Sequence, residues 1–195
     1  MGFPGWHIEC SAMACKYLGE QFDIHTGGID LSRVHHINEI AQAESITDIH
    51  PWVNVWVHGE FLNMGEEKMA RSKGNVMTVT RLEDMGIEAL DYRYFTYQSH
   101  YRKQANFSEA SLQAAHVGLK KLRRQVQQIE TEKTDKEVEE NFLSAINDDM
   151  NMPEALAILF TALKEKRISK ETAKKFDTVL GLNLSIRHQK GNVWF

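Results

Sequence analysis

The sequence of 195 residues contains only two cysteines and no apolar run long enough to cross a membrane. Cys10 and Cys15 lie five positions apart on an expected helix, and two thiols are too few for a disulfide framework. The first residues also lack the basic and apolar regions of a signal peptide. These absences predict a protein of the reducing cytoplasm without a membrane span.

A strong excess of basic charge is lacking as well. The formal net charge is −4, and only residues 81–129 carry more basic than acidic side chains, eight against five. A nucleic-acid binder with a continuous basic face would have a different balance. The basic residues Lys120, Lys121, Arg123 and Arg124 are therefore expected to form a solvated helix face, with nucleic-acid contact as the alternative.

The spacing of apolar residues predicts a parallel α/β layer at the start of the chain. The expected elements are a helix over 7–18 that ends at Gly19, a strand over 21–25, a helix over 35–46 and a buried strand over 53–62. Two strands are too few for a complete doubly wound sheet. We expect a partial parallel sheet.

The second half of the chain has helical patterns and aromatic residues that suit a bundle core. We expect a turn over 81–85, an aromatic helical stretch over 87–99 and a helix from Ser108 to about 129. Three further helices are expected: one begins with a Thr134–Glu137 capping box, one begins at Pro153, and one runs from Ser169 to Gly181. The predicted fold class is α/β, a partial parallel sheet followed by an all-helical bundle.

A cationic stretch follows the apolar run 52–62. Lys68, Arg71 and Lys73 lie within six residues, bordered by glycine and asparagine. Cations placed where negative charge develops on a phosphoryl group stabilise its transfer. The glycine-rich phosphate-binding pattern is absent, so a solvated turn remains the alternative to a polyphosphate site.

Three residues are candidate metal ligands. His35 and Glu39 are four positions apart on a predicted helix, so they project from one face. Together with Cys10 they offer an imidazole, a carboxylate and a thiolate, a set that suits Zn²⁺. A fourth ligand is not visible, and a core cysteine beside a chance His–Glu pair is the alternative.

Three further residues have open roles. His25 ends a predicted strand before Thr26-Gly27-Gly28, where open α/β sheets bind ligands, although a capped turn histidine would look the same. Trp6 is either a pocket wall or a core anchor. His36 is expected to face away from His35, either as a group that supports the ligands from behind or as a surface group.

Four strings in order carry a specific resemblance: Pro4–Met13, Phe22–Gly28, His35–Gln42 and Glu67–Asn75. Together they resemble cysteinyl-tRNA synthetases, class I enzymes with a Rossmann-like catalytic domain, and Ala145–Leu156 is similar to the start of that family's helical domain. The resemblance implies the C-terminal half of a Rossmann-like catalytic domain in 1–80, a helical connective region in 81–130 and the start of a helical tRNA-binding domain in 131–195.

The resemblance also implies roles for the candidate residues. Cys10, His35 and Glu39 match three of four zinc ligands, and Trp6 and His25 match the pocket for substrate cysteine. Residues 68–72 match the loop that closes on ATP and its Mg²⁺, which assigns Lys68, Met69, Arg71 and Ser72 to ATP and gives Lys68 and Arg71 the catalytic role.

Two kinds of departure accompany the match. Ser32-Arg33-Val34 replaces an aromatic–proline step, and Ile37 replaces a common acid. The family's His-x-Gly-His motif and the fourth zinc ligand are not in these residues.

The expected function is therefore part of a cysteine–tRNA ligase, which joins cysteine to tRNA-Cys with ATP. We expect the chain alone to be inactive and to retain zinc weakly, with the missing N-terminal half a possible separate partner. The alternatives are a non-catalytic tRNA- or partner-binding remnant and a related ligase that joins cysteine to an amino sugar.

Overall fold

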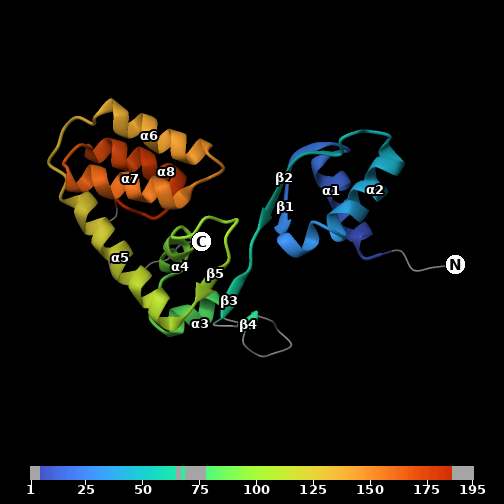
Figure 1. Cartoon of the computed structure of the whole chain (residues 1–195), viewed down its shortest axis with the longest axis horizontal. Coiled ribbons are helices and arrows are strands. Elements are labelled where there is room, and N and C mark those ends of the chain that lie inside the picture. The colour runs from blue at the N-terminus through green and yellow to red at the C-terminus, as the bar shows by residue number, and fades with distance from the viewer. Residues whose placement is uncertain (1–4, 65–66, 69–77, 186–195) are drawn as a thin grey trace. The chain divides into compact units, whose positions relative to one another are not determined.

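The computed structural model describes residues 5–64, 67–68 and 78–185 of the chain (Figure 1). Contacts between residues divide it into two compact units. The first comprises Met1–Phe61 and Tyr101–Gln104, and the second comprises Leu62–His100 and Ala105–Phe195. Within the described residues, no helix combines the length and the apolar character needed to span a membrane.

The first unit is a small parallel α/β layer. Its elements are α1 (His7–Leu18), β1 (Phe22–Gly28), a 3-10 turn η1 (Ile29–Leu31), α2 (His35–Thr47) and β2 (Val53–Gly59). β1 and β2 pair in parallel, with Phe22 opposite Val53 and Gly28 opposite Gly59, and α1 packs against α2 (Figure 1). The predicted order of helices and strands is confirmed, and Gly19, with a φ of 99°, ends α1 as expected.

The expectation of one buried strand over 53–62 is wrong in two respects. β2 ends at Gly59, and Leu62 already belongs to another sheet. Only Val53 of β2 is buried, whereas Val55 is 51% exposed. In the described part of the chain this sheet has only two strands, so much of its apolar surface stays uncovered.

The second unit combines a short sheet with a helical bundle. β3 (Leu62–Met64) lies between β4 (Glu67–Lys68), which is antiparallel to it, and β5 (Ala105–Phe107), which is parallel. The helices are α3 (Val79–Asp84), α4 (Ala89–Thr96), α5 (Glu109–Gln127), α6 (Lys136–Asn147), α7 (Met152–Lys164) and α8 (Lys170–Leu180). The predicted bundle is confirmed, and the small sheet was not predicted.

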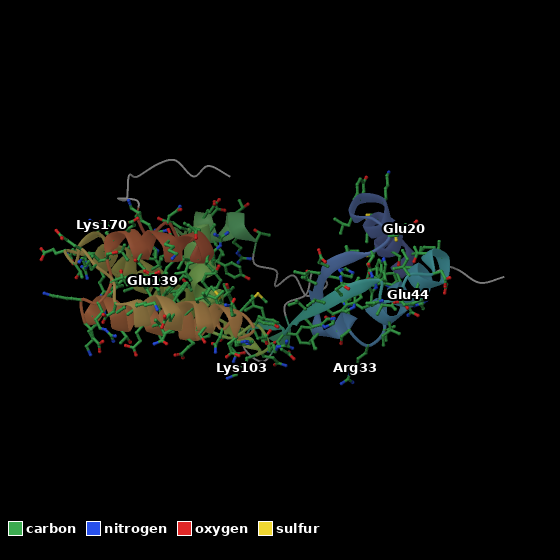
Figure 2. All side chains as sticks on the ribbon, turned by 90° about the horizontal axis from the view of Figure 1, so that it is seen from above. Glu20, Arg33, Glu44, Lys103, Glu139 and Lys170 are labelled. Atoms are coloured by element: carbon green, nitrogen blue, oxygen red, sulfur yellow. The ribbon has the colours of Figure 1, made fainter. Side chains whose placement is uncertain are left out.

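The bundle core follows the helical period of α5. Its buried residues recur every three or four positions and form one apolar stripe: Leu112, Ala115, Leu119, Leu122 and Val126. Tyr94 and Phe95 of the aromatic stretch join the same core, as expected, and Phe142 stacks on Phe176 with ring centroids 3.7 Å apart. Charged side chains such as Glu139 and Lys170 project outwards (Figure 2).

Most predicted caps form, and one does not. The Ser108 and Ser169 hydroxyls each accept the backbone N–H three residues on, and Gly181 ends α8 with φ of 59°. The Thr134–Glu137 capping box is absent, because α6 begins after Asp135. The Thr134 hydroxyl instead accepts the backbone N–H of Ser169 at 2.8 Å, so it links the starts of two helices.

Arg123 departs from the solvated face that its basic neighbours form. Lys120, Lys121 and Arg124 are exposed, but Arg123 is buried. It donates to the carbonyl oxygen of Leu182 from Nε at 3.1 Å and Nη2 at 2.9 Å, and from Nη1 to Glu88 at 3.1 Å. The guanidinium therefore ties the segment after α8 to α5.

We predict that Arg123→Met lowers the free energy of unfolding of the helical unit by about 1–3 kcal/mol, because it leaves the buried Leu182 carbonyl without a donor. Arg124→Met is the matched control, since it removes the same charge from an exposed neighbour. Guanidinium unfolding followed by far-ultraviolet circular dichroism measures both. Equal stability of the two variants would show that the buried hydrogen bonds of Arg123 do not contribute to the free energy of unfolding.

Candidate metal centre

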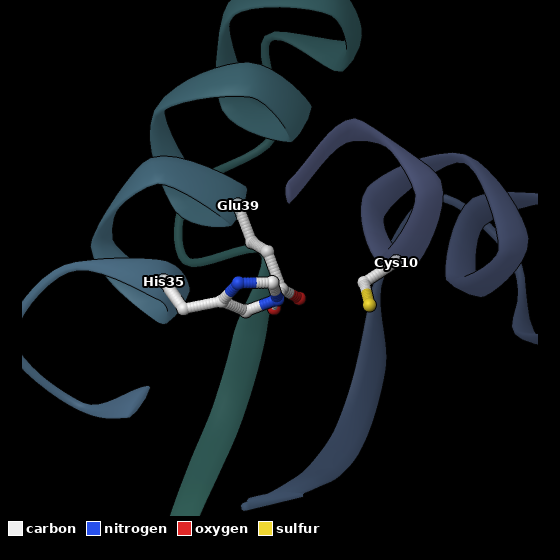
Figure 3. A group of neighbouring side chains, drawn as sticks. All are labelled: Cys10, His35 and Glu39. Carbon is white, nitrogen blue, oxygen red and sulfur yellow. Dashed lines mark ion pairs between the residues drawn. The ribbon is translucent and has the colours of Figure 1, made fainter. Parts of the chain in front are cut away.

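The three candidate ligands converge between α1 and α2. Cys10 projects from α1, and His35 and Glu39 project from successive turns of α2 towards it (Figure 3). One ligand atom from each residue lies within 4.8 Å of the others. The i, i+4 spacing of the α2 pair and the packing of the two helices thus bring together the thiol, imidazole and carboxylate that the sequence suggested.

The carboxylate of Glu39 is the buried centre of this group. Glu39 is 1% exposed, and its Oε2 lies 2.7 Å from His25 Nε2. Its Oε1 lies 2.8 Å from His35 Nε2, yet the two atoms lack hydrogen-bond alignment, so Oε1 is a buried oxygen without a donor in the described chain. Such an oxygen is costly to bury unless a cation compensates it. The residues therefore fit a metal ion of borderline softness.

The thiol of Cys10 responds to the same surroundings. Burial raises the pKa of Cys10, and the negative charges of Glu39 and Glu9 raise it further. Without a cation the thiol is therefore protonated at neutral pH. Because a metal ligates the thiolate, binding at this group releases a proton and is favoured by rising pH.

Histidines at the end of the parallel strands extend the group. His36 Nδ1 lies 2.7 Å from His58 Nε2 on β2, and its ring centroid lies 4.9 Å from that of His25 on β1. His25, His36 and Glu39 form a second set whose ligating atoms fall within 4.8 Å. Of the two positions expected for His36, the surface is wrong, because it is 3% exposed; it lies beside the candidate ligands instead.

A close approach of the backbone makes room for His36. A Cβ atom at Gly27 would lie 2.5 Å from Cε1 and 2.8 Å from Nε2 of the His36 ring. Only glycine lets the imidazole rest against the end of β1 at this distance. Thr26, Gly27 and Gly28 form the end of β1 and not the turn expected after His25, and Gly27 makes room for the histidine cluster of His25, His36 and His58.

His7 belongs to the site and was not among the predicted residues. Its Nδ1 lies 2.8 Å from Nδ1 of His35, and it occupies the face of α1 that carries Cys10 three residues later. That helical spacing was the available signal in the sequence. Trp6 is 62% exposed, so it is not a core anchor, and its ring centroid lies 4.2 Å from that of His35.

The two departures at the start of α2 do not enter the cluster. Arg33 is exposed and its side chain extends away from the ribbon (Figure 2), and Ile37 is 55% exposed. Neither side chain lies among the candidate ligands. Both substitutions therefore leave the described geometry of the group intact.

Comparison with known proteins assigns the chain to a family. The family described as "tRNA synthetases class I (C) catalytic domain" matches residues 1–117. The chain belongs to the class I (C) tRNA synthetases. This membership confirms the resemblance that the four sequence strings carry.

Curated relatives agree with the class I (C) assignment. A cysteine–tRNA ligase of Treponema denticola is 40% identical over 94% of this chain and 43% of its own length. One of Hydrogenovibrio crunogenus is 45% identical over 84% of this chain and 36% of its own length. The chain thus spans about two-fifths of the length of these relatives.

A solved structure shares the fold. The ternary complex of Agrobacterium radiobacter K84 agnB2 LeuRS with tRNA and LeuAMS superposes with a TM-score of 0.55 and 14% identity. The match covers 83% of this chain and 24% of that one. It supports the class I α/β architecture followed by helices.

The predicted ATP loop of this synthetase chain is only partly described. The backbone of Lys68 lies in β4 and pairs with Asn63. Met69, Arg71 and Ser72 lie outside the described residues. Their assignment to ATP remains a prediction.

The histidine cluster makes the stability of the first unit depend on pH. The pKa of His36 is lowered from 6.5 to about 4, mainly by burial and in part by the neighbouring His25, His58 and His35, while Glu39 opposes the shift. In the unfolded chain His36 takes up a proton below its ordinary pKa, whereas in the folded chain it stays neutral. The free energy of unfolding therefore falls as pH falls from about 6.5 to about 4.

We predict that His36→Asn flattens this pH dependence, because the amide keeps a polar group near His58 and does not titrate. The substitution is expected to reduce the slope of the free energy of unfolding against pH by at most about 1.4 kcal/mol per pH unit. Urea unfolding at several pH values can be followed by tryptophan fluorescence, since Trp6, Trp52 and Trp56 all lie in the first unit. Parallel pH profiles for the two proteins would contradict a neutral, buried His36.

Proposed function

We propose that this chain is part of an ATP-dependent cysteine–tRNA ligase. The observation that carries the proposal is the convergence of Cys10, His35 and Glu39 in a chain whose curated relatives are cysteine–tRNA ligases. In this proposal residues 1–80 belong to the catalytic domain, 81–130 form a connective region, and 131–195 begin a helical tRNA-binding domain. The nucleic-acid partner of this last part is tRNA-Cys.

Cysteine is selected at the metal centre. Zn²⁺ held by Cys10, His35 and Glu39 supplies a borderline-soft Lewis acid that prefers a thiolate to a hydroxyl, which separates cysteine from serine. His25 fixes Glu39 through the 2.7 Å contact at Oε2, and Trp6 borders His35 on its exposed side. These two residues line the amino-acid pocket.

ATP activates cysteine at the cationic loop of residues 68–72. A carboxylate oxygen of cysteine attacks the α-phosphorus of Mg²⁺-bound ATP, and pyrophosphate leaves with the electrons of the broken P–O bond. Lys68 and Arg71, with Met69 and Ser72, hold the phosphates and stabilise the charge on pyrophosphate. The 3′ hydroxyl of tRNA then attacks the activated carbonyl, loses its proton and displaces AMP.

The complete site needs more than these residues. The curated relatives are more than twice as long as the part they share with this chain. We propose that residues of that additional part complete the ATP site and the metal's ligand set, whether joined to this chain or supplied by a separate N-terminal half. The relatives' names favour tRNA over an amino sugar as acceptor.

We predict that the 195-residue chain alone lacks cysteine-dependent ATP–pyrophosphate exchange, and that adding the N-terminal part of a relative restores it. In the completed enzyme Arg71→Ala lowers the exchange rate by about 10²-fold, because one charge-stabilising donor is lost. Lys103→Ala, a basic residue outside the loop, is the matched control. Robust exchange by the chain alone would contradict an incomplete site, and transfer to an amino sugar instead of tRNA would favour the related ligase.

We predict that the chain binds one Zn²⁺ weakly and that Cys10→Ser reduces its affinity by at least about tenfold, because a hydroxyl is a poor zinc ligand. Cys15→Ser is the matched control, since Cys15 lies on the same helix and packs beside the apolar cluster of Trp52. Competition with a chromophoric chelator measures both affinities. An equal loss of zinc affinity in both variants would show that Cys10 is not a metal ligand.

A further inference from the structure

His7 touches the candidate ligand His35 on the side away from Glu39. The two Nδ1 atoms are 2.8 Å apart, the ring centroids 4.5 Å apart, and the rings are inclined by 70°. The other nitrogen of His35, Nε2, lies 2.8 Å from Oε1 of Glu39. His35 therefore has its Nδ1 held by His7, while its Nε2 faces the candidate metal position.

The short distance between the Nδ1 atoms fixes how protons are shared. One of two imidazole nitrogens at 2.8 Å must donate and the other must accept. If His35 ligates a metal through Nε2, the proton of its neutral ring is on Nδ1, and it donates to His7. His7 then accepts at Nδ1 and carries its own proton on Nε2.

A second arrangement suits the metal-free chain. The Nδ2 amide of Asn38 lies 3.4 Å from His7 Nε2 and donates to the Val34 carbonyl at 2.9 Å. When Asn38 also donates to His7, the His7 proton is on Nδ1 and that of His35 is on Nε2, beside the Glu39 carboxylate. The change to the metal-bound arrangement gives up the long 3.4 Å contact of Asn38 and the approach of the His35 Nε2 proton to Glu39, whose place a bound cation would take.

His7 has no other evident task among the described residues. It is not a member of either set of converging ligand atoms, because its Nδ1 is engaged with His35. It is also outside the apolar cluster of Ala43, Trp52 and Val53 that forms the core of the first unit. Its polar contacts run to α2, where His35 and Asn38 lie.

We propose that His7 is a positioning residue that holds His35 in the orientation and tautomer that bind the metal, without binding it directly. This inference rests on the proposed metal centre at Cys10, His35 and Glu39. A hydrogen bond to the distal nitrogen of a ligating histidine raises its basicity and restricts its ring. His7 therefore sets the affinity of the centre from α1, the helix that also supplies Cys10.

The test compares His7→Phe with His7→Asn in the 195-residue chain. Phenylalanine keeps a ring of similar size and removes both nitrogens, whereas the asparagine side chain keeps an acceptor near the position of Nδ1. Titration with Co²⁺, and Zn²⁺ competition against it, measure affinity and the ligand-field absorption bands. His7→Phe is expected to weaken binding about 10- to 100-fold and to shift the bands, and His7→Asn to recover most of the loss.

Controls separate this role from background effects and from the metal site itself. His50→Phe removes an exposed histidine of the same unit that contacts Glu44, and it should leave affinity and bands unchanged. The positioning role is wrong if His7→Asn binds the metal as weakly as His7→Phe. It is also wrong if both variants bind the metal like the unaltered chain. In either case the metal centre itself is supported as long as Cys10→Ser and Glu39→Gln lose affinity. If Cys10→Ser and Glu39→Gln also keep full affinity, the proposed centre itself fails.

Discussion

The first unit depends on the compensation of one buried carboxylate. Glu39 is nearly inaccessible to solvent, and a buried charge without partners destabilises a fold by several kcal/mol, roughly 3–5 when a partner is removed. Its two oxygens face His35 and His25, and Cys10 lies opposite. Because these groups come from α1, β1 and α2, the position of Glu39 constrains how all three elements pack.

Local patterns predicted most of the helices because their determinants are local. The helix over 7–18, its glycine stop and the serine caps at 108 and 169 depend on residues within one turn of each other. The three-stranded sheet could not be predicted in this way, since Leu62 pairs with Ala105 and strands of two or three residues have no periodicity. Thr134 likewise looked like a local cap, but its partners lie on α8.

The sequence predicted the candidate ligands, but it did not predict the side chains that surround them. Cys10, His35 and Glu39 have the chemistry and spacing of metal ligands, and the four family strings add to this. The inward position of His36 depends on the missing Cβ of Gly27 and on His58, which are far from it in sequence. Such three-dimensional contacts decide which way a histidine at the start of a helix points, so spacing alone left open whether His36 supports the ligands or lies at the surface.

The choice of imidazoles around Glu39 also bears on how a metal could enter. A lysine or arginine would neutralise the carboxylate permanently and compete with an arriving cation, whereas a histidine can give up its proton at neutral pH. Arg33, the arginine nearest to α2 in sequence, is exposed. Without a metal the 2.7 Å contact of His25 holds Oε2 of Glu39, while Oε1, which no donor among the described residues reaches, stays available to a cation together with His35 and Cys10. Imidazoles around a buried carboxylate therefore suit metal binding. They contact the carboxylate in the metal-free state and leave its charge available to an arriving cation.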